Sequence, residues 1–127
     1  MSIIKSIKGL FGQTIHYKDG QKIGETWDSF IPGVKNHYDA NGSLSGYSAK
    51  GWIADEVHYG KNGEYVGASY EGVFDSMHHY GANGSHGVST KGLTGTTTYA
   101  SDDEDALLFS DPDFDSPSFG DSFDSDW

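Results

Sequence analysis

Four His-Tyr pairs recur along the chain at one interval of 21 residues, beginning at His16, His37, His58 and His79. Imidazole is a common ligand of transition metals, so four histidines on one face of a sheet could form a metal-binding ladder. No carboxylate recurs in phase with them, however, and histidine also suits a half-exposed strand position beside tyrosine. We therefore predict no metal site and no cofactor.

The sequence also favours a protein without catalytic activity. It contains no Gly-Xaa-Ser-Xaa-Gly elbow, no phosphate-binding loop and no His-Glu-Xaa-Xaa-His motif. The acidic residues Asp55, Glu56 and Asp75 lie in variable linkers rather than recurring as a pair. A repeat spreads similar surface over several units, which suits binding better than a single reaction centre.

Each histidine belongs to a unit with the composition of a β-hairpin. A turn glycine follows each pair, and a second glycine, a hydroxyl residue and an apolar cluster come after it. Asn-Gly and Asp-Gly tolerate the positive φ of tight turns, and the second glycine indicates a bulge or close packing of neighbouring units. Hairpin turns are predicted at Asp19-Gly20, Asn41-Gly42, Asn62-Gly63 and Asn83-Gly84.

These units predict an all-β domain over residues 13–100, built of about four hairpins. Seventeen glycines within the first hundred residues argue against helices there. Because a lone hairpin is only marginally stable, the units must share apolar surface. A twisted meander and a hairpin solenoid both fit. We expect the face that carries Tyr17 and Tyr59 to be the core side, with the repeated histidines on the other.

Residues 1–12 predict a short amphipathic helix before the repeats. Ile3, Ile4, Ile7, Leu10 and Phe11 fall on one side of such a helix, with two lysines on the other. The helix could cap the first hairpin, or residues 2–11 could make weak contact with a membrane surface.

Residues 101–127 form an acidic segment whose composition predicts disorder. They hold ten acidic and no basic groups, whereas residues 1–100 hold nine acidic and eight basic ones. The chain has no arginine and a net charge of −11, so direct binding to nucleic acid is not expected. The segment nevertheless carries large apolar residues. Those predicted to bind a partner protein are Phe114, Phe119, Phe123 and Trp127.

Three further features of the sequence bear on where in the cell the protein is found. It has no cysteine, no apolar stretch long enough to span a membrane, and an N-terminus unlike a signal peptide. We expect a cytoplasmic protein.

Several hairpin repeat families resemble this unit. Tyr38-Asp39-Ala40-Asn41-Gly42 is similar to the core of short, uncharacterised bacterial Tyr/Gly hairpin-repeat proteins and of tyrosine-aspartate repeats in bacterial toxin shells. The Gly/Tyr hairpins also resemble MORN repeats. Gly51-Trp52, followed by His58-Tyr59 and Asn62-Gly63, resembles cell-wall-binding and choline-binding repeats, which implies ligand binding between aromatic residues. The candidates for that role are Trp27, Tyr47, Trp52, Tyr70 and Phe74.

The sequence thus leaves three hypotheses of function. The leading one is a bacterial or phage interaction protein, in which a small β scaffold carries an acidic aromatic tail that binds a partner protein. The second is a carbohydrate or cell-wall ligand module that uses the aromatic residues of the repeats. The third is a phage-type inhibitor whose acidic tail mimics nucleic acid.

Overall fold

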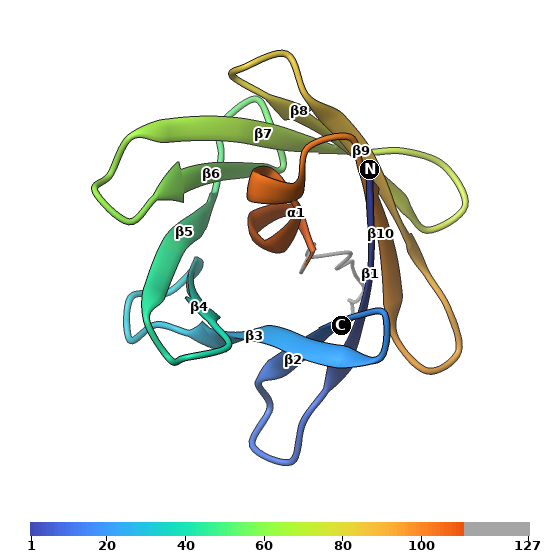
Figure 1. The fold of residues 1–127 in the computed structure, drawn as a ribbon. Helices are drawn as coiled ribbons and strands as arrows, with labels where there is room; N and C mark the ends of the chain where they lie inside the picture. The colour runs from blue at the N-terminus through green and yellow to red at the C-terminus, as the bar shows by residue number, and fades with distance from the viewer. Residues whose placement is uncertain (111–127) are drawn as a thin grey trace, which may run out of the picture.

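The fold is a single closed barrel of ten antiparallel strands in meander order (Figure 1). A computed structural model describes residues 1–110, without the side chains of residues 104 and 105. The strands are β1 (Ser2–Lys8), β2 (Thr14–Lys18), β3 (Gln21–Asp28), β4 (Val34–Asp39), β5 (Leu44–Lys50), β6 (Glu56–Gly60), β7 (Tyr65–Glu71), β8 (Ser76–Gly81), β9 (His86–Lys91) and β10 (Thr96–Ala100), and α1 (Asp103–Phe109) is the helix that follows them. The prediction of an all-β fold of antiparallel hairpins is confirmed, and of the two architectures that fit the sequence the strands follow the meander order. The sheet is closed by pairing of β1 with β10, however, and is neither an open sheet nor a solenoid.

The four predicted hairpin turns are confirmed. Gly20, Gly42, Gly63 and Gly84 all have φ between 80° and 91°. In the first turn Asp19 also has a positive φ, of 55°, and Lys18 pairs with Gln21 across it. Two positive φ values in a two-residue loop match the turns that join twisted strands most readily.

A β-bulge follows the histidine in the first three hairpins. The strand register shifts between His16 and Tyr17, and again after His37 and His58. The fourth hairpin is regular, with His79 opposite Gly87 and Tyr80 opposite His86. Its returning strand has one residue fewer between the turn and the second glycine, so the extra residue that makes a bulge is missing.

The prediction of an N-terminal helix is wrong, because Ser2–Lys8 forms strand β1. Ser2, Ile4 and Ser6 are buried, whereas Ile3, Lys5 and Ile7 lie outside. This two-residue alternation is that of a strand, and the adjacent isoleucines fit a pleated sheet better than a helix. β1 lies between β2 and β10, so residues 1–12 are part of the barrel and not a separate segment.

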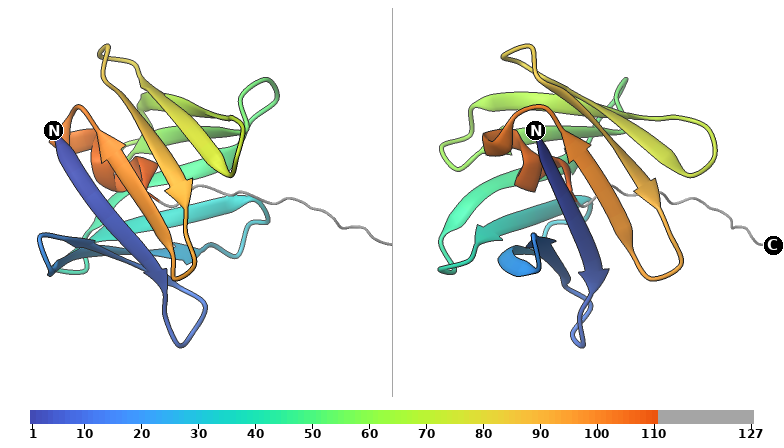
Figure 2. Two further views of the ribbon diagram at one scale, coloured as in Figure 1. Left: turned by 90° about the vertical axis from the view of Figure 1, so that its right-hand side faces the viewer. Right: turned by 45° about the vertical axis from the view of Figure 1, so that its right-hand side comes forward.

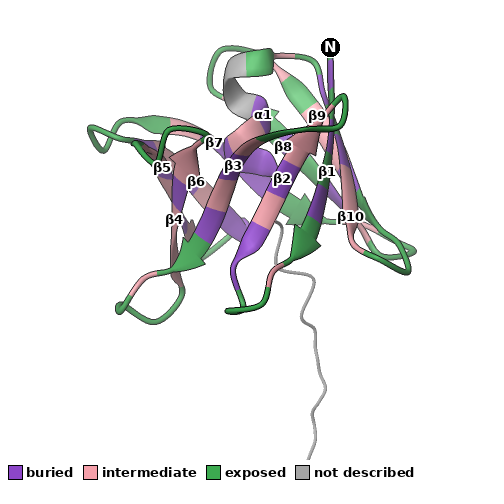
Figure 3. Cartoon of the chain, turned by 60° about the horizontal axis from the view of Figure 1, so that its bottom comes forward, coloured by how far each residue is buried: buried purple, intermediate pink, exposed green. Residues whose placement is uncertain are grey.

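The prediction of which strand face forms the core is also wrong. The repeated histidines are 0–1% exposed inside the barrel, and the tyrosines lie on its outer wall. Buried residues gather on the strands and exposed ones in the loops (Figure 3). Among the described residues, 15 polar or charged side chains are buried against eight hydrophobic ones. A two-residue period separates the two faces of a strand without showing which one is inside.

The second glycine of each unit allows neighbouring hairpins to pack closely, as expected. A Cβ atom on any of them would lie 2.3–2.5 Å from a backbone carbonyl oxygen of the next hairpin. The pairs are Gly24 with Tyr38, Gly46 with Tyr59, Gly67 with Tyr80 and Gly87 with Tyr99. No real Cβ contact is that short, so a larger residue would push the hairpins apart.

Helix α1 fills one end of the barrel interior (Figures 1 and 2). Leu107 and Leu108 reach the space left by Gly24 and Gly46. Phe109 is 1% exposed and stacks on the ring of His79 at 4.9 Å between ring centroids. At the start of the helix, the Ser2 hydroxyl donates to the Asp103 carboxylate, and Lys18 lies 3.8 Å from the same carboxylate.

The boundary predicted at residue 101 is therefore wrong, since residues 103–110 belong to the barrel. Leu107, Leu108 and Phe109 are apolar because they are part of its core. The four aromatic residues predicted to bind a partner, from Phe114 to Trp127, lie outside the described residues. Within residues 1–110, no helix has the length and apolar character needed to cross a bilayer.

We predict that Phe109→Ala lowers the free energy of unfolding by ~3–5 kcal/mol, as for other buried aromatics cut to alanine. Phe30→Ala is the matched control, because this side chain is 97% exposed, and its effect should stay within ~0.5 kcal/mol. Urea unfolding followed by circular dichroism measures both. Equal effects would contradict the position assigned to α1.

Candidate functional site

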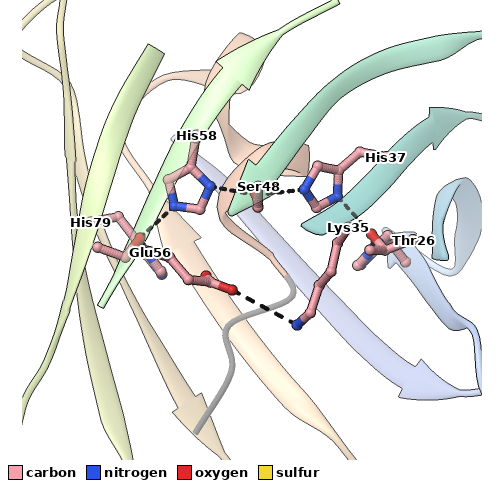
Figure 4. Close-up of polar contacts among 9 residues, drawn as sticks. Thr26, Lys35, His37, Ser48, Glu56, His58 and His79 are labelled. Atoms are coloured by element: carbon pink, nitrogen blue, oxygen red, sulfur yellow. Dashed lines mark hydrogen bonds and ion pairs between the residues drawn. The ribbon is translucent and has the colours of Figure 1, made fainter. Parts of the chain in front are cut away.

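A continuous chain of hydrogen bonds runs around the inside of the barrel and takes one side chain from every strand. Nine contacts of 2.6–2.8 Å join its ten members, and Figure 4 shows the central part. In order from β1 to β10 they are Ser6, His16, Thr26, His37, Ser48, His58, Ser69, His79, Ser89 and Thr98. We call this set the buried chain.

The repeat places these side chains because hydroxyl and histidine alternate from strand to strand between β1 and β9. Within a hairpin, His37 lies opposite Gly46, and this leaves its ring room to reach the hydroxyl two residues beyond, on Ser48. Between hairpins, Ser48 lies directly opposite His58. The spacing from histidine to hydroxyl and the 21-residue period thus continue one line of contacts across the sheet.

The hydrogen-bond partners at the β1 end determine the direction of every proton in the chain. Ser6 Oγ lies 2.9 Å from the Ser110 carbonyl oxygen and donates to it, because a carbonyl cannot donate. Ser110 Oγ likewise donates to the Leu107 carbonyl at 2.7 Å. The hydroxyl groups of Ser6 and Ser110 both lie beside His16 Nδ1, but each already donates its proton to a carbonyl oxygen. Neither can donate to His16 Nδ1, so this nitrogen must itself be protonated.

When the four rings are neutral, the same assignment of donor and acceptor repeats along the whole buried chain. With its proton on Nδ1, His16 accepts at Nε2 from Thr26, so His37 must donate from its own Nδ1 to Thr26. Each step repeats this pattern as far as Thr98, which donates to Ser89. All four histidines are the Nδ1–H tautomer, and each member of the chain has a partner for its single proton.

Burial keeps the rings of His37, His58 and His79 neutral. It lowers the pKa of His37, His58 and His79 from 6.5 to about 3, because the charged form loses its hydration. The positive charge of Lys35 adds to the effect on His37 and His58, and protonation of one ring would further disfavour protonation of the next. A protonated ring would also need two acceptors and would break the single direction of the chain.

The buried chain contains Ser–His contacts of 2.6 Å, the separation of a nucleophile and its base. Ser48, His58 and Ser69 are each at most 1% exposed, however, and Phe109 packs against the rings of His58 and His79. A substrate cannot reach the hydroxyls without displacing α1, so we assign the chain a structural role. No group of three or more His, Cys, Asp or Glu side chains within the described residues is arranged to hold a metal.

Beside the buried chain lies an ion pair between Lys35 of β4 and Glu56 of β6 (Figure 4). Lys35 Nζ is 3.8 Å from Glu56 Oε2, and the Glu56 carboxylate is almost fully buried. The pair sits on the interior face at the end of the barrel opposite α1 and joins two hairpins there.

The structure does not bring together the aromatic residues proposed as a ligand site. Tyr47 and Tyr70 lie on the outer wall, and Trp52 and Phe74 lie in two separate loops, almost fully exposed. Trp27 alone lines a groove, of about 470 Å³, across β3 and β4. Its Nε1 donates to Glu25 at 2.8 Å, and Tyr38 and Asn36 form the β4 side of the groove.

A second candidate site is a ring of exposed apolar side chains at one end of the barrel. In an antiparallel meander, the five loops that follow odd-numbered strands share one end, and α1 enters from the other. Every one of these five loops carries large apolar residues that are 52–107% exposed. They are Leu10, Phe11, Phe30, Ile31, Trp52, Ile53, Val73, Phe74 and Leu93, and we call them the apolar crown.

The crown loops are held in place by hydrogen bonds between neighbouring loops. Lys50 N donates to the Gly33 carbonyl at 3.2 Å, and Lys91 N donates to the Asp75 carbonyl at 3.0 Å. Between these two contacts, Glu71 N donates to the Asp55 carboxylate at 2.6 Å. Phe74 has a φ of 55°, which is rare for a bulky residue and costs of order 1–3 kcal/mol. The loops therefore present their apolar tips in fixed positions.

The sequence did contain a signal for the crown. Its residues from Phe30 to Leu93 form the apolar cluster that ends each repeat, but the clusters suggest core residues when the strands are not yet closed into a barrel. Leu10 and Phe11 were assigned to a helix. Comparisons with models of protein families, with curated proteins and with solved structures found no match to this chain. The function proposed for this protein therefore rests on its geometry.

The buried histidines predict a loss of stability in acid. Their pKa values are lower in the folded than in the unfolded state, so the unfolded chain binds more protons below pH 6.5. Their stabilising effect is complete above about pH 6.5 and falls toward pH 3, by ~2 kcal/mol per histidine at pH 5. Urea unfolding at pH 7 and pH 5 should differ by ~6 kcal/mol for the three rings.

The control for this effect replaces the exposed histidines, His78→Gln and His86→Gln. This variant should keep the same dependence of stability on pH. Equal stability of the unmodified protein at pH 7 and pH 5 would contradict neutral buried rings.

The proton order is open to NMR. We predict that ¹⁵N spectra at neutral pH show four rings as the Nδ1–H tautomer, with slowly exchanging ring protons, while His78 and His86 give the signals of solvated imidazoles. Ser6→Ala removes one of the two hydroxyls that fix the direction and should change the spectrum of His16 most. A majority of buried rings protonated at Nε2 would show that the direction is reversed.

Proposed function

We propose that the protein is a non-catalytic binding protein and that the apolar crown is its docking surface. The observation that carries this proposal is the presence of exposed apolar tips on all five loops at one end. Exposed apolar residues scattered singly are common on protein surfaces, but nine of them gathered on the five loops at one end of the barrel indicate an interaction site. Burying one such side chain completely is worth ~1.5–3 kcal/mol, so docking could gain much from nine of them.

The rest of the molecule supports this function by making a rigid support. The buried chain and α1 occupy the interior of the barrel at the level of the histidines. The inter-loop hydrogen bonds fix the crown before a partner arrives, which reduces the entropy lost on binding. These features support a binding surface with fixed anchors better than a reaction centre.

The acidic tail remains a second proposed docking element. Partner binding through Phe114, Phe119, Phe123 and Trp127 concerns residues outside the described part of the chain. The inhibitor hypothesis, in which the tail mimics nucleic acid, concerns the same residues. Truncation to test either idea must stop at Ser110, since a chain that ends at Ala100 would lose α1 and the contacts of Phe109.

The positions of the aromatic residues limit where on this protein a carbohydrate could bind. Five separated side chains cannot hold one ligand, so any sugar would have to bind in the groove of Trp27. An indole face with the neighbouring Tyr38 ring, the Asn36 amide and the Glu25 carboxylate is suited to a polar ring-shaped ligand. This groove is the second candidate, and the crown is the larger surface.

We predict that Trp52→Ser with Phe74→Ser prevents docking in an extract of the cells that express the protein naturally. Size-exclusion chromatography and sedimentation of the extract should show the unmodified protein in assemblies larger than its 13.8 kDa and the double variant free. Tyr65→Ser with Tyr80→Ser is the matched control, because these half-exposed aromatics lie outside the crown. The control should behave like the unmodified protein.

A chain ending at Ser110 separates the crown from the tail in the same assay. If the crown variant stays in the assemblies while the shortened chain is released, the tail is the docking element and the crown proposal fails.

A further inference from the structure

The partner of the crown can be narrowed by the shape of this surface, on the basis of the function proposed above. Its apolar residues stand on five separate loops around the mouth of the barrel and do not form one continuous patch. A protein partner would need five matching pockets in a ring. A lipid surface is flat and fluid, so it can accept all five tips at once without any such match.

The backbone of the crown loops is suited to an apolar environment. Peptide groups that enter a bilayer must have their hydrogen bonds satisfied within the protein. In the β3–β4 loop Ser29 N donates to the Val34 carbonyl at 3.0 Å. In the β7–β8 loop Gly72 N donates to the Ser76 carbonyl at 2.9 Å, and in the β9–β10 loop Gly92 N donates to the Gly95 carbonyl at 2.6 Å. Each of these three loops closes at its base with a backbone hydrogen bond, so the peptide groups there need no water when the loop tip enters the headgroup region.

The charges at the crown end decide which lipid it fits. Three strands have an exposed lysine as their last residue at this end, and exposed carboxylates lie between these lysines. The lysines are Lys8, Lys50 and Lys91, and the carboxylates are Asp28, Asp55, Glu71 and Asp75. Within residues 1–110, three positive and four negative exposed groups at this end give a sum of −1, so attraction to anionic headgroups is not expected. Insertion of apolar side chains must supply the affinity.

The opposite end is more acidic. Among the side chains described there, Lys18, Lys22 and Lys61 face six carboxylates, which gives a sum of −3. These are Asp19, Glu25, Asp39, Glu64, Asp102 and Asp103. Docking through the crown leaves this more acidic end in water, where its charged groups stay hydrated.

We infer that the apolar crown binds the surface of an electrically neutral lipid bilayer, with its loop tips inserted to the depth of the headgroup boundary. Trp52 and the phenylalanines are side chains that favour this interface. The strands that lead into three of these loops end at Lys8, Lys50 and Lys91. At this distance from the loop tips, the lysine ammonium groups can stay in water while their aliphatic chains contact lipid.

The test uses the purified full chain and vesicles of phosphatidylcholine. We expect the protein to sediment with these vesicles, with less than about a twofold change in affinity between low and high salt, because insertion and not charge drives binding. Trp52→Ser with Phe74→Ser should weaken binding at least about tenfold, since it removes two inserted side chains. Tyr65→Ser with Tyr80→Ser should bind like the unmodified protein.

A direct readout comes from tryptophan fluorescence with lipids brominated near the headgroup. Quenching by these lipids should be lost in Trp52→Phe and kept in Trp27→Phe and Trp127→Phe. Quenching that survives Trp52→Phe would place another part of the chain in the lipid and overturn the inference.

The other possible partners give different results. Binding only to vesicles that contain phosphatidylglycerol, with a steep salt dependence, would overturn insertion into neutral lipid. Self-association in analytical ultracentrifugation that is lost in the crown variant, without vesicle binding, would assign the crown to a second copy. If the crown variant leaves the cellular assemblies but no vesicle is bound, the docking function stands and the lipid inference fails.

Discussion

The structure depends on a polar core that must satisfy itself. A ten-stranded barrel of short strands has an interior that four histidines and six hydroxyl residues cross as one hydrogen-bonded line. Each of these groups would be costly to bury alone, at several kcal/mol for an unpaired polar group. Because every member uses its one proton for the next, the cost is removed only when all ten strands are present and in register. The buried chain therefore fixes the register of neighbouring strands from β1 to β10, and backbone pairing of β1 with β10 closes the barrel.

Register explains why the repeat is so regular in some positions and so free in others. A slip of one residue in any strand would move its histidine to the outer wall and would interrupt the line. The turn between Asp19 and Gly20 and the missing bulge at His79 show that one residue can be lost from a turn or a bulge while the histidine and its hydroxyl partner keep their places. The second glycines are equally constrained, since the carbonyl group of the next hairpin occupies the space of a side chain.

The elements predicted correctly were those that depend on local chemistry. Hairpin turns follow from Asn-Gly and Asp-Gly, and the two faces of each strand follow from the two-residue alternation. The side that forms the core was not predictable by hydrophobicity, because His37 and its counterparts are acceptable inside only as members of a chain that spans the molecule. For a related reason the sequence did not predict closure of the barrel. The isoleucines and lysines of β1 make it look unlike the repeats, although Ser6 continues their pattern of histidine and hydroxyl residues. Leu108 and Phe109 were assigned to a tail because nothing local shows that a helix will turn back into the barrel.

The polar interior also explains why the apolar residues of this protein lie where they do. In most small domains large apolar side chains are used up by the core. Here histidine, serine and threonine fill the middle of the barrel, α1 supplies Phe109 at one end, and the phenylalanines, isoleucines and tryptophan of the linkers have no place inside. A fold that required these residues for its stability could not expose them. This fold derives its specificity from the buried chain, so its loops can carry an apolar crown, and the surface that docks can change without disturbing the hydrogen bonds inside the barrel.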